Sequence, residues 1–168
     1  MRVDINSDEE IIVFLSKSYI PELNFIDRKK TEIYFKNLFR KLSKNYNIET
    51  NGFYDVNVYI NNYYGYVLEI IIDNMDYYTY FGNQIDMKIN IIKDNDFLYE
   101  IDFLYLEPSF LKFCDIYKSG KYLYLKIKKD IDNITLGRIL ERSNIVYGEE
   151  SKKILKESIE VRIWKQLL

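Results

Sequence analysis

The chain has 168 residues, a formal net charge of −2 and no histidine. This length predicts one ordinary domain or two very small ones, and the near-neutral charge excludes a global field that would attract nucleic acid or an anionic membrane. With one cysteine, no apolar leader and no apolar run of membrane length, we expect a soluble cytoplasmic protein with no role for membrane or nucleic acid.

Aromatic residues are abundant, with 17 tyrosines and 10 phenylalanines, whereas alanine is absent. Ile, Lys, Asn, Tyr and Phe have AT-rich codons, so an AT-rich genome explains much of this excess. Individual tyrosine clusters in predicted turns remain candidates for function.

Residues 1–73 predict the order strand, strand, helix, strand, strand. Two β-branched runs, 2–5 and 11–15, flank a turn-prone segment and indicate a hairpin. Ser7 and Glu10 have capping-box spacing, which leaves a helix start as the alternative for the second run.

Residues 28–46 predict the clearest helix, with Asp27 as its N-cap. An apolar stripe recurs at helical spacing, formed by Phe35, Leu38, Phe39, Leu42 and Tyr46. Basic residues occupy much of the remaining surface, namely Arg28, Lys29, Lys30, Lys36, Arg40, Lys41 and Lys44. We interpret them as the solvated side of the helix, with a phosphate-binding face as the alternative.

Residues 53–60 and 66–72 predict a second hairpin, in which Gly65 supplies the unusual backbone angles of the turn. The first of these strands alternates, with one face formed by Tyr54, Val56, Val58 and Ile60.

The second half predicts two more hairpins. The first joins residues 85–92 to 97–104 through KDND, and the second spans 115–127 about KSGK. A helical turn with Pro108 near its start separates them.

Two helices follow these hairpins in the sequence pattern. Asn133 or Asp132 caps a helix that ends near Ser143. A last helix begins near Glu149 and runs to the end of the chain, with one stripe formed by Leu155, Ile159 and Ile163.

These elements predict an α+β fold of two small halves, each a mostly antiparallel sheet of hairpins packed against one or two helices. The N-terminal half is residues 1–73, the Tyr-rich connection is 74–83, and the C-terminal half is 84–168.

The absence of histidine excludes the usual Ser-His, Cys-His and His-metal sites. Neither GxGxxG nor GxxxxGK occurs. We therefore predict a protein that is not an enzyme, with no catalytic residues, no metal and no cofactor.

Acidic clusters are the remaining candidates for chemistry. Asp130, Asp132 and Glu141 have calcium-loop spacing, but Ile134 and Thr135 stand where an oxygen ligand and a glycine are needed, so helix capping explains these acids better.

A second acidic cluster lies two or four residues apart on a predicted strand and consists of Asp96, Glu100 and Asp102. We interpret it as a polar strand face, with a carboxylate-based hydrolase as the alternative. Cys114 has no adjacent basic residue and is predicted to be a packed apolar thiol.

Five tyrosines fall in predicted turns or the connection: Tyr63, Tyr64, Tyr77, Tyr78 and Tyr80. No Lys or Arg occurs from Asp55 to Met87, so phosphate has no counter-charge there and a protein partner fits better than nucleic acid. We predict that at least two of these rings are exposed in a protein-binding patch, with rings folded inward over the sheet as the alternative.

The order of these features resembles the MecA family of adaptor proteins. In the first half the resemblance lies in MRVDI, EIIVFL, the Leu38-Phe39 pair and the Asn51-Gly52 step before DVNVYI. In the second half it lies in FLYEIDFL, the Tyr-rich hairpin DIYKSGKYLYLKI and ILERSNIVYGEES.

The resemblance implies a non-catalytic adaptor that presents substrates or regulators to a Clp-type unfoldase–protease. Residues 1–73 would take the substrate or regulator, and the C-terminal half would dock to the unfoldase. The alternative is a stand-alone binding or scaffold protein without a Clp link. The oligomeric state stays open.

Overall fold

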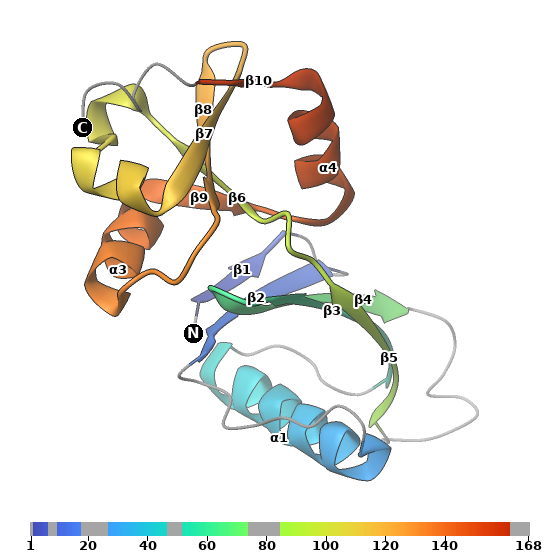
Figure 1. Ribbon diagram of the computed structural model, residues 1–168. Helices are drawn as coiled ribbons and strands as arrows, with labels where there is room; N and C mark the ends of the chain where they lie inside the picture. Colours follow the sequence, from blue (N-terminus) through green and yellow to red (C-terminus); the bar gives the residue numbers. More distant parts are fainter. Residues whose placement is uncertain (1, 7–9, 18–26, 47–51, 74–84, 162–168) are drawn as a thin grey trace. The chain divides into compact units, whose positions relative to one another are not determined.

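The computed structural model describes residues 2–6, 10–17, 27–46, 52–73 and 85–161. They form an α+β fold with two mostly antiparallel five-stranded sheets, which confirms the predicted fold class (Figure 1). The chain divides into two compact units that are not continuous in sequence. The first comprises Met1–Val58 and Tyr66–Ile92, and the second comprises Tyr59–Gly65 and Lys93–Leu168.

The first unit contains a sheet of order β1-β2-β4-β3-β5. Its strands are β1 (Arg2–Ile5), β2 (Glu10–Ser16), β3 (Gly52–Asn61), β4 (Gly65–Asp73) and β5 (Ile85–Lys93). β1 and β2 pair antiparallel with Arg2 opposite Phe14, which confirms the N-terminal hairpin. Glu10 lies in β2, so the alternative of a helix start is wrong.

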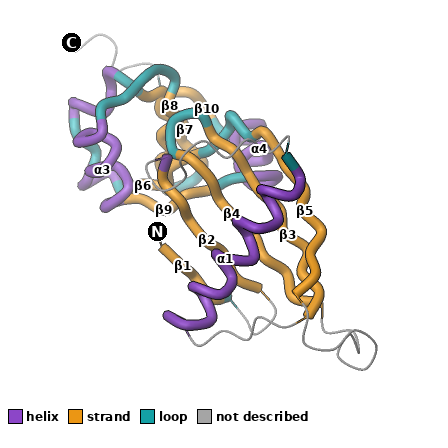
Figure 2. The backbone as a smooth tube through the Cα atoms, turned by 90° about the horizontal axis from the view of Figure 1, so that it is seen from below, coloured by secondary structure: helices purple, strands orange, loops and turns teal. Residues whose placement is uncertain are grey.

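Helix α1 (Arg28–Tyr46) lies over one face of this sheet (Figures 1 and 2). Asp27 caps it as predicted, since its Oδ1 accepts a hydrogen bond from the Lys30 N–H at 3.2 Å. The Phe39 ring stacks on Tyr54 of β3 with centroids 4.8 Å apart. Four stripe residues are buried: Phe35, Leu38, Phe39 and Leu42. The fifth, Tyr46, is 41% exposed because the helix ends there.

Side-chain hydrogen bonds connect β4, β3 and β5. The Asn57 amide donates to Glu69 at 3.0 Å, and the Asn90 amide donates to both Asp55 at 2.8 Å and Asn57 at 2.9 Å. These polar side chains alternate along β3 with the buried Tyr54, Val56 and Val58. β3 therefore shows the predicted alternation.

The predicted hairpin of residues 85–92 with 97–104 is wrong. β5 is the neighbour of β3 in the first sheet, whereas β6 (Leu98–Ile101) pairs with strands of the second. The hydrogen bonds of Asn90 to β3 stabilise this placement, which a local turn pattern at KDND could not reveal. The chain passes from one compact unit to the other after Val58, after Gly65 and after Ile92.

The second unit contains a sheet of order β10-β7-β8-β6-β9. Its other strands are β7 (Cys114–Ser119), β8 (Tyr122–Ile127), β9 (Ser143–Val146) and β10 (Ile159–Glu160). Each neighbouring pair is antiparallel. β7 and β8 form the predicted hairpin, and Gly120 adopts the left-handed φ of 58° that its turn requires.

Both faces of this second sheet carry apolar clusters. On one face, Ile139 of α3 (Asn133–Arg142) and Phe110 of the 3₁₀ helix η3 (Pro108–Lys112) pack with Tyr99 and Ile101. The opposite face holds a cluster of Leu98, Tyr124 and Val146, covered by Ile154 and Leu155 of α4 (Gly148–Glu157). The sheet is therefore buried from both sides.

The start of α3 confirms one sequence prediction, and the end of α4 corrects another. Asp132 caps α3 by accepting from the Thr135 N–H at 2.8 Å. The helix predicted to run from Glu149 to the end of the chain stops at Glu157. Ile159 then pairs in β10 and is 75% exposed, so it does not continue a stripe with Leu155, and Ile163 lies outside the described residues.

The buried residue Asp94 connects the β3–β4 turn to the start of α4 within the second unit. Asp94, 3% exposed, accepts hydrogen bonds from the backbone N–H of Asp96 at 2.9 Å and of Gly148 at 2.7 Å. The Asn61 amide donates to the Asp94 carbonyl at 3.0 Å. A Cβ on Gly148, whose φ is 66°, would lie 3.2 Å from the Tyr59 ring, so glycine fits this position. Three distant chain segments therefore meet at Asp94.

Candidate functional site

An exposed apolar turn follows β6 in the second unit. It is the 3₁₀ helix η2 (Phe103–Tyr105), whose three residues we name the FLY turn. Phe103, Leu104 and Tyr105 are 61%, 84% and 53% exposed. Consecutive exposed apolar side chains of this size are typical of surfaces that bind other proteins.

Local hydrogen bonds shape the FLY turn. The Asp102 carboxylate caps it by accepting from the Leu104 N–H at 2.9 Å, and the Asp102 carbonyl accepts from the Tyr105 N–H at 3.0 Å. Leu106 then packs against the core of the second unit, and its N–H donates to the Phe103 carbonyl at 3.2 Å. The turn is thus anchored at both ends while its side chains face solvent.

Glu107, which follows Leu106, connects the segment after the FLY turn to helix α3. The Glu107 carboxylate accepts hydrogen bonds from Ser109 at 3.1 Å and from Arg138 at 3.4 Å, and it also binds Arg142. Desolvation opposes ionisation of Glu107, but the hydrogen bonds from Ser109 and Arg142 and the charges of both arginines outweigh it and lower its pKa. A charged clamp therefore adjoins the apolar turn.

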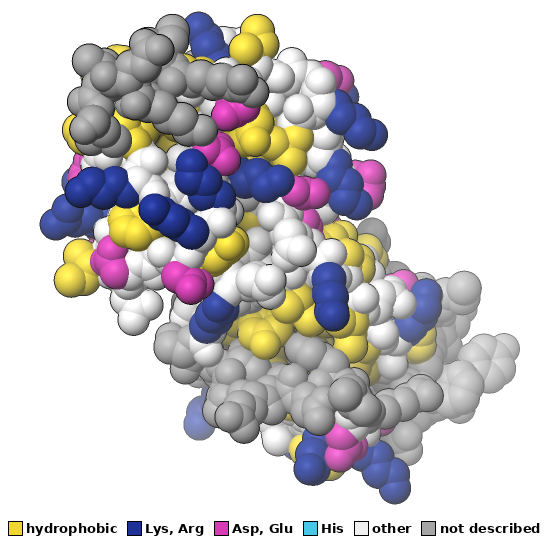
Figure 3. Space-filling model, viewed as in Figure 1, with side chains coloured by type: hydrophobic (Ala, Val, Ile, Leu, Met, Phe, Trp, Pro, Cys, Tyr) yellow, Lys and Arg dark blue, Asp and Glu magenta, His cyan; other side chains and the backbone are white. Residues whose placement is uncertain are grey.

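The second unit carries both signs of charge on its surface. In Figure 3 the visible face of the second unit intersperses Lys and Arg with Asp, Glu and apolar side chains. Such a mixed surface suits a protein partner better than a polyanion, which needs a contiguous basic patch.

The five tyrosines predicted as a binding patch are only partly described by the structure. Tyr64 is buried, with its ring 6.4 Å from that of Phe97, and Tyr63 packs half-buried against the core of the second unit. These two rings agree with the alternative prediction, in which the rings fold inward over the sheet. Tyr77, Tyr78 and Tyr80 lie outside the described residues.

The three carboxylates of the hydrolase alternative have separate partners. Asp96 pairs with Lys126, Glu100 accepts from the Tyr124 hydroxyl at 3.1 Å, and Asp102 caps the FLY turn. β6 ends at Ile101, so the three do not lie on one strand as predicted.

The face of β6 that bears Glu100 is also not the solvated face that we expected. It includes Leu98, which is fully buried, and it adjoins Tyr124 of the neighbouring strand β8, which is 5% exposed. Burial, followed by its hydrogen bond to Glu100, raises the pKa of Tyr124 to about 12. No group of three or more Cys, Asp or Glu that could hold a metal occurs in the described part of the chain.

Cys114 is packed in the apolar core as predicted. It is 3% exposed, and burial raises the pKa of its thiol to about 12. A neutral buried thiol is a poor nucleophile at physiological pH.

Comparisons with protein-family models, with curated proteins and with solved structures find no match to this chain. Within the described residues, no helix has the length and apolar character needed to cross a membrane.

Sequence reasoning missed the FLY turn because it treated residues 97–104 as one strand. The signal was present in Asp102, a capping residue followed by four apolar residues and then Glu107-Pro108. A run of four apolar residues also occurs in strands covered on both faces, so the signal of a turn here is Asp102 before the run and Pro108 after it.

Proposed function

We propose that this protein is a non-catalytic protein-binding protein that docks to its partner through the FLY turn. The carrying observation is the exposure of three consecutive large apolar side chains on a turn anchored by Asp102 and Leu106. Because the backbone of the turn is already ordered, binding costs little conformational entropy there.

The resemblance to MecA-type adaptors supports a choice of partner. FLYEIDFL, one of the segments on which the resemblance rests, ends in Phe103-Leu104. In this proposal the second unit docks to a Clp-type unfoldase, and residues 1–73 take a substrate or regulator.

The test is binding of the purified protein to the Clp-type unfoldase of the source organism, measured by biolayer interferometry. Leu104→Ser with Tyr105→Ser removes two exposed apolar side chains and should weaken binding at least about tenfold, in the range typical of interface anchors. The matched control is Ile134→Ser with Ile159→Ser, because these residues are 72% and 75% exposed in the same unit. The control should bind like the unchanged protein, and both variants should keep its melting temperature.

Other outcomes separate the alternatives. Capture of a different protein through the FLY turn, without binding to the unfoldase, would favour a stand-alone binding protein. Undiminished binding by the Leu104→Ser, Tyr105→Ser variant would show that this turn is not the docking surface.

A further inference from the structure

Helix α1 concentrates positive charge in a chain that is otherwise acidic. It contains seven basic residues and one acidic residue, Glu32, so its formal charge is +6. Because the whole chain carries −2, the remaining residues carry −8. This separation of charge is not apparent from the net value, which suggested that no field attracts an anionic partner.

Part of this charge has no ionic partner among the residues that the structure describes. Lys30 pairs with Asp27 at 3.6 Å and Lys36 pairs with Glu32 at 2.7 Å. Among the described residues, none of the remaining exposed cations of the helix forms an ion pair; they are Lys29, Arg40, Lys41 and Lys44. Arg40 donates only to the neutral side chain of Asn37, at 3.0 Å.

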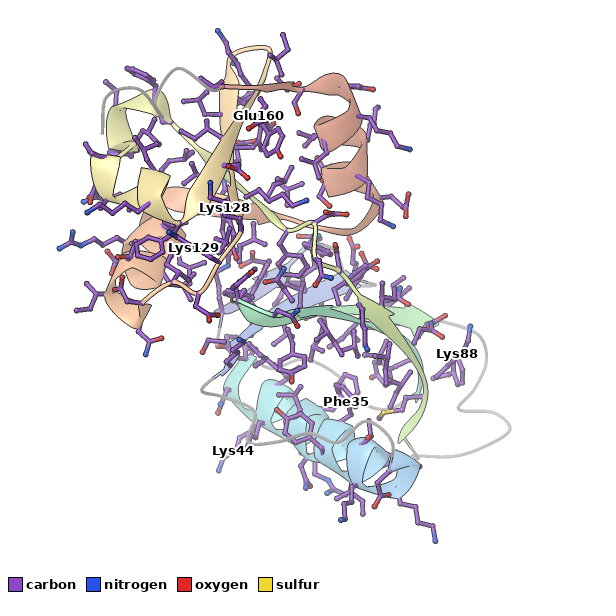
Figure 4. All side chains as sticks on the ribbon, in the orientation of Figure 1. Phe35, Lys44, Lys88, Lys128, Lys129 and Glu160 are labelled. Atoms are coloured by element: carbon purple, nitrogen blue, oxygen red, sulfur yellow. The ribbon has the colours of Figure 1, made fainter. Side chains whose placement is uncertain are left out.

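Three of these cations fall on one side of α1 together with an exposed apolar residue. Lys29, Ile33, Arg40 and Lys44 follow helical spacing opposite the buried stripe, and we name them the basic stripe. Phe35 points toward the sheet and Lys44 away from it (Figure 4). At 1.5 Å per residue the stripe extends for roughly 22 Å, and Ile33 within it is 59% exposed.

We propose that the basic stripe docks an acidic segment of a partner protein that carries an apolar side chain for Ile33. At physiological salt, charges more than about 8 Å from a short acidic segment bound along the stripe are largely screened, so the nearby charges of α1 dominate its binding. A nucleic acid or an anionic membrane extends further and is repelled by the −8 carried by the rest of the chain. The aliphatic side chain of Ile33 also has no charge and no hydrogen-bond donor for a phosphate group.

This surface is independent of the FLY turn and adds a second type of contact to the proposed function. Membrane binding is further disfavoured because an amphipathic helix that binds lipid presents a broad apolar face to it. In α1 that apolar face is already buried against the sheet, and among its described side chains Ile33 and Tyr46 are the large hydrophobics that remain exposed.

The test uses a short fluorescein-labelled peptide of glutamates and aspartates around two central leucines, with fluorescence anisotropy on the full chain at about 0.15 M ionic strength. Lys29→Gln with Arg40→Gln and Lys44→Gln should weaken binding about tenfold, as expected for three exposed charge contacts. The control with the same change in charge is Lys112→Gln, Lys118→Gln and Lys153→Gln, which are exposed residues of the second unit. The control should change the affinity by less than about twofold.

Ile33→Ser tests the apolar part of the proposal. It should weaken binding of the leucine-containing peptide and leave a purely acidic peptide unaffected. Equal losses in the stripe and control variants would overturn the proposal, as would tighter stripe-dependent binding of duplex DNA or phosphatidylserine vesicles. The Leu104→Ser, Tyr105→Ser variant should bind the peptide normally, which separates this test from that of the FLY turn.

Discussion

Strands β3 and β6 occupy equivalent places, each next to an edge strand of a five-stranded sheet, yet they bury their residues differently. β3 alternates buried Tyr54 and Val56 with polar Asp55 and Asn57. β6 buries Leu98 and Tyr99 in succession, at 0% and 1% exposure. The difference shows that strict alternation of buried and polar residues indicates a strand with one apolar face. Successive buried residues indicate a strand that is covered on both faces.

The largest expected effect is on the side of β3 that α1 covers. Phe39→Ala should lower the free energy of unfolding by about 3–5 kcal/mol, because the ring is 1% exposed and stacks on Tyr54. Urea unfolding followed by circular dichroism measures this. Ile33→Ala on the opposite side of the helix is the control and should stay within about 0.5 kcal/mol. An equal loss in both variants would mean that burial does not distinguish the two sides.

The face of β6 opposite α3 should also contribute to the free energy of unfolding. Leu98→Ala is expected to cost about 2–5 kcal/mol, since the side chain is fully buried beneath Ile154 and Leu155 of α4. The same urea titration applies, with the 72% exposed Ile134→Ala as control. A loss near that of the control would show that α4 does not build a second core, and the comparison with β3 would fail.

A smaller loss in the free energy of unfolding is expected at the buried carboxylate of Asp94 in the second unit. Asp94→Asn removes one of the two acceptor oxygens that bind the N–H groups of Asp96 and Gly148. One unsatisfied buried donor costs about 1–3 kcal/mol. Hydrogen exchange at the Gly148 amide should accelerate by more than in an Asp130→Asn control, and an unchanged Gly148 amide would contradict this role of Asp94.

The last prediction concerns the free energy of unfolding at alkaline pH. We expect no change in it near neutral pH. Burial raises the pKa of Cys114 from 9.0 to about 12 and that of Tyr124 from 10.0 to about 12. A raised folded-state pKa gives a contribution that is complete below the unfolded value and is lost as pH rises toward the folded value. Stability should therefore be level from neutral pH to about pH 9 and should fall between pH 9 and 12.

Urea midpoints measured across this range test the window. Cys114→Val removes the earlier of the two titrations, so its decline should begin nearer pH 10, the ordinary value of Tyr124. Identical curves for the two proteins would show that the thiol does not contribute.

The sequence predicted well those elements that depend on neighbouring residues. The spacing of Phe35, Phe39 and Leu42 placed α1, and the capping residues Asp27 and Asp132 marked helix starts that the structure confirms. Both signals arise within a few residues along the chain, so no tertiary information is needed to interpret them.

The failures concern partners that are distant in sequence. β5 looks like half of a hairpin, but Asn90 hydrogen-bonds to β3, more than 30 residues earlier. The strand β9 has four residues and no alternation, so nothing local distinguishes it from the end of a helix. Glu100 looked solvated because the sequence does not show that α4 covers that face.

The candidate surfaces were visible only in part. The sequence shows that α1 is basic. Only the structure shows that Lys30 and Lys36 form ion pairs. The local pattern places the FLY turn in a strand, whereas the structure shows a 3₁₀ helix, and two of the five candidate tyrosines, Tyr63 and Tyr64, pack inward. Exposure depends on the whole fold, so side-chain type alone could not decide these cases.

The hydrogen bond between Gly148 and Asp94 has a consequence for protein synthesis. The ribosome adds about 5–20 residues per second, so roughly 4–17 s separate the emergence of Tyr64 from that of Gly148. During this interval the turn that carries Tyr63 and Tyr64 has been made, but the segment that begins α4 has not. We therefore expect the nascent chain to expose these tyrosines to chaperones until Gly148 and the start of α4 have been made.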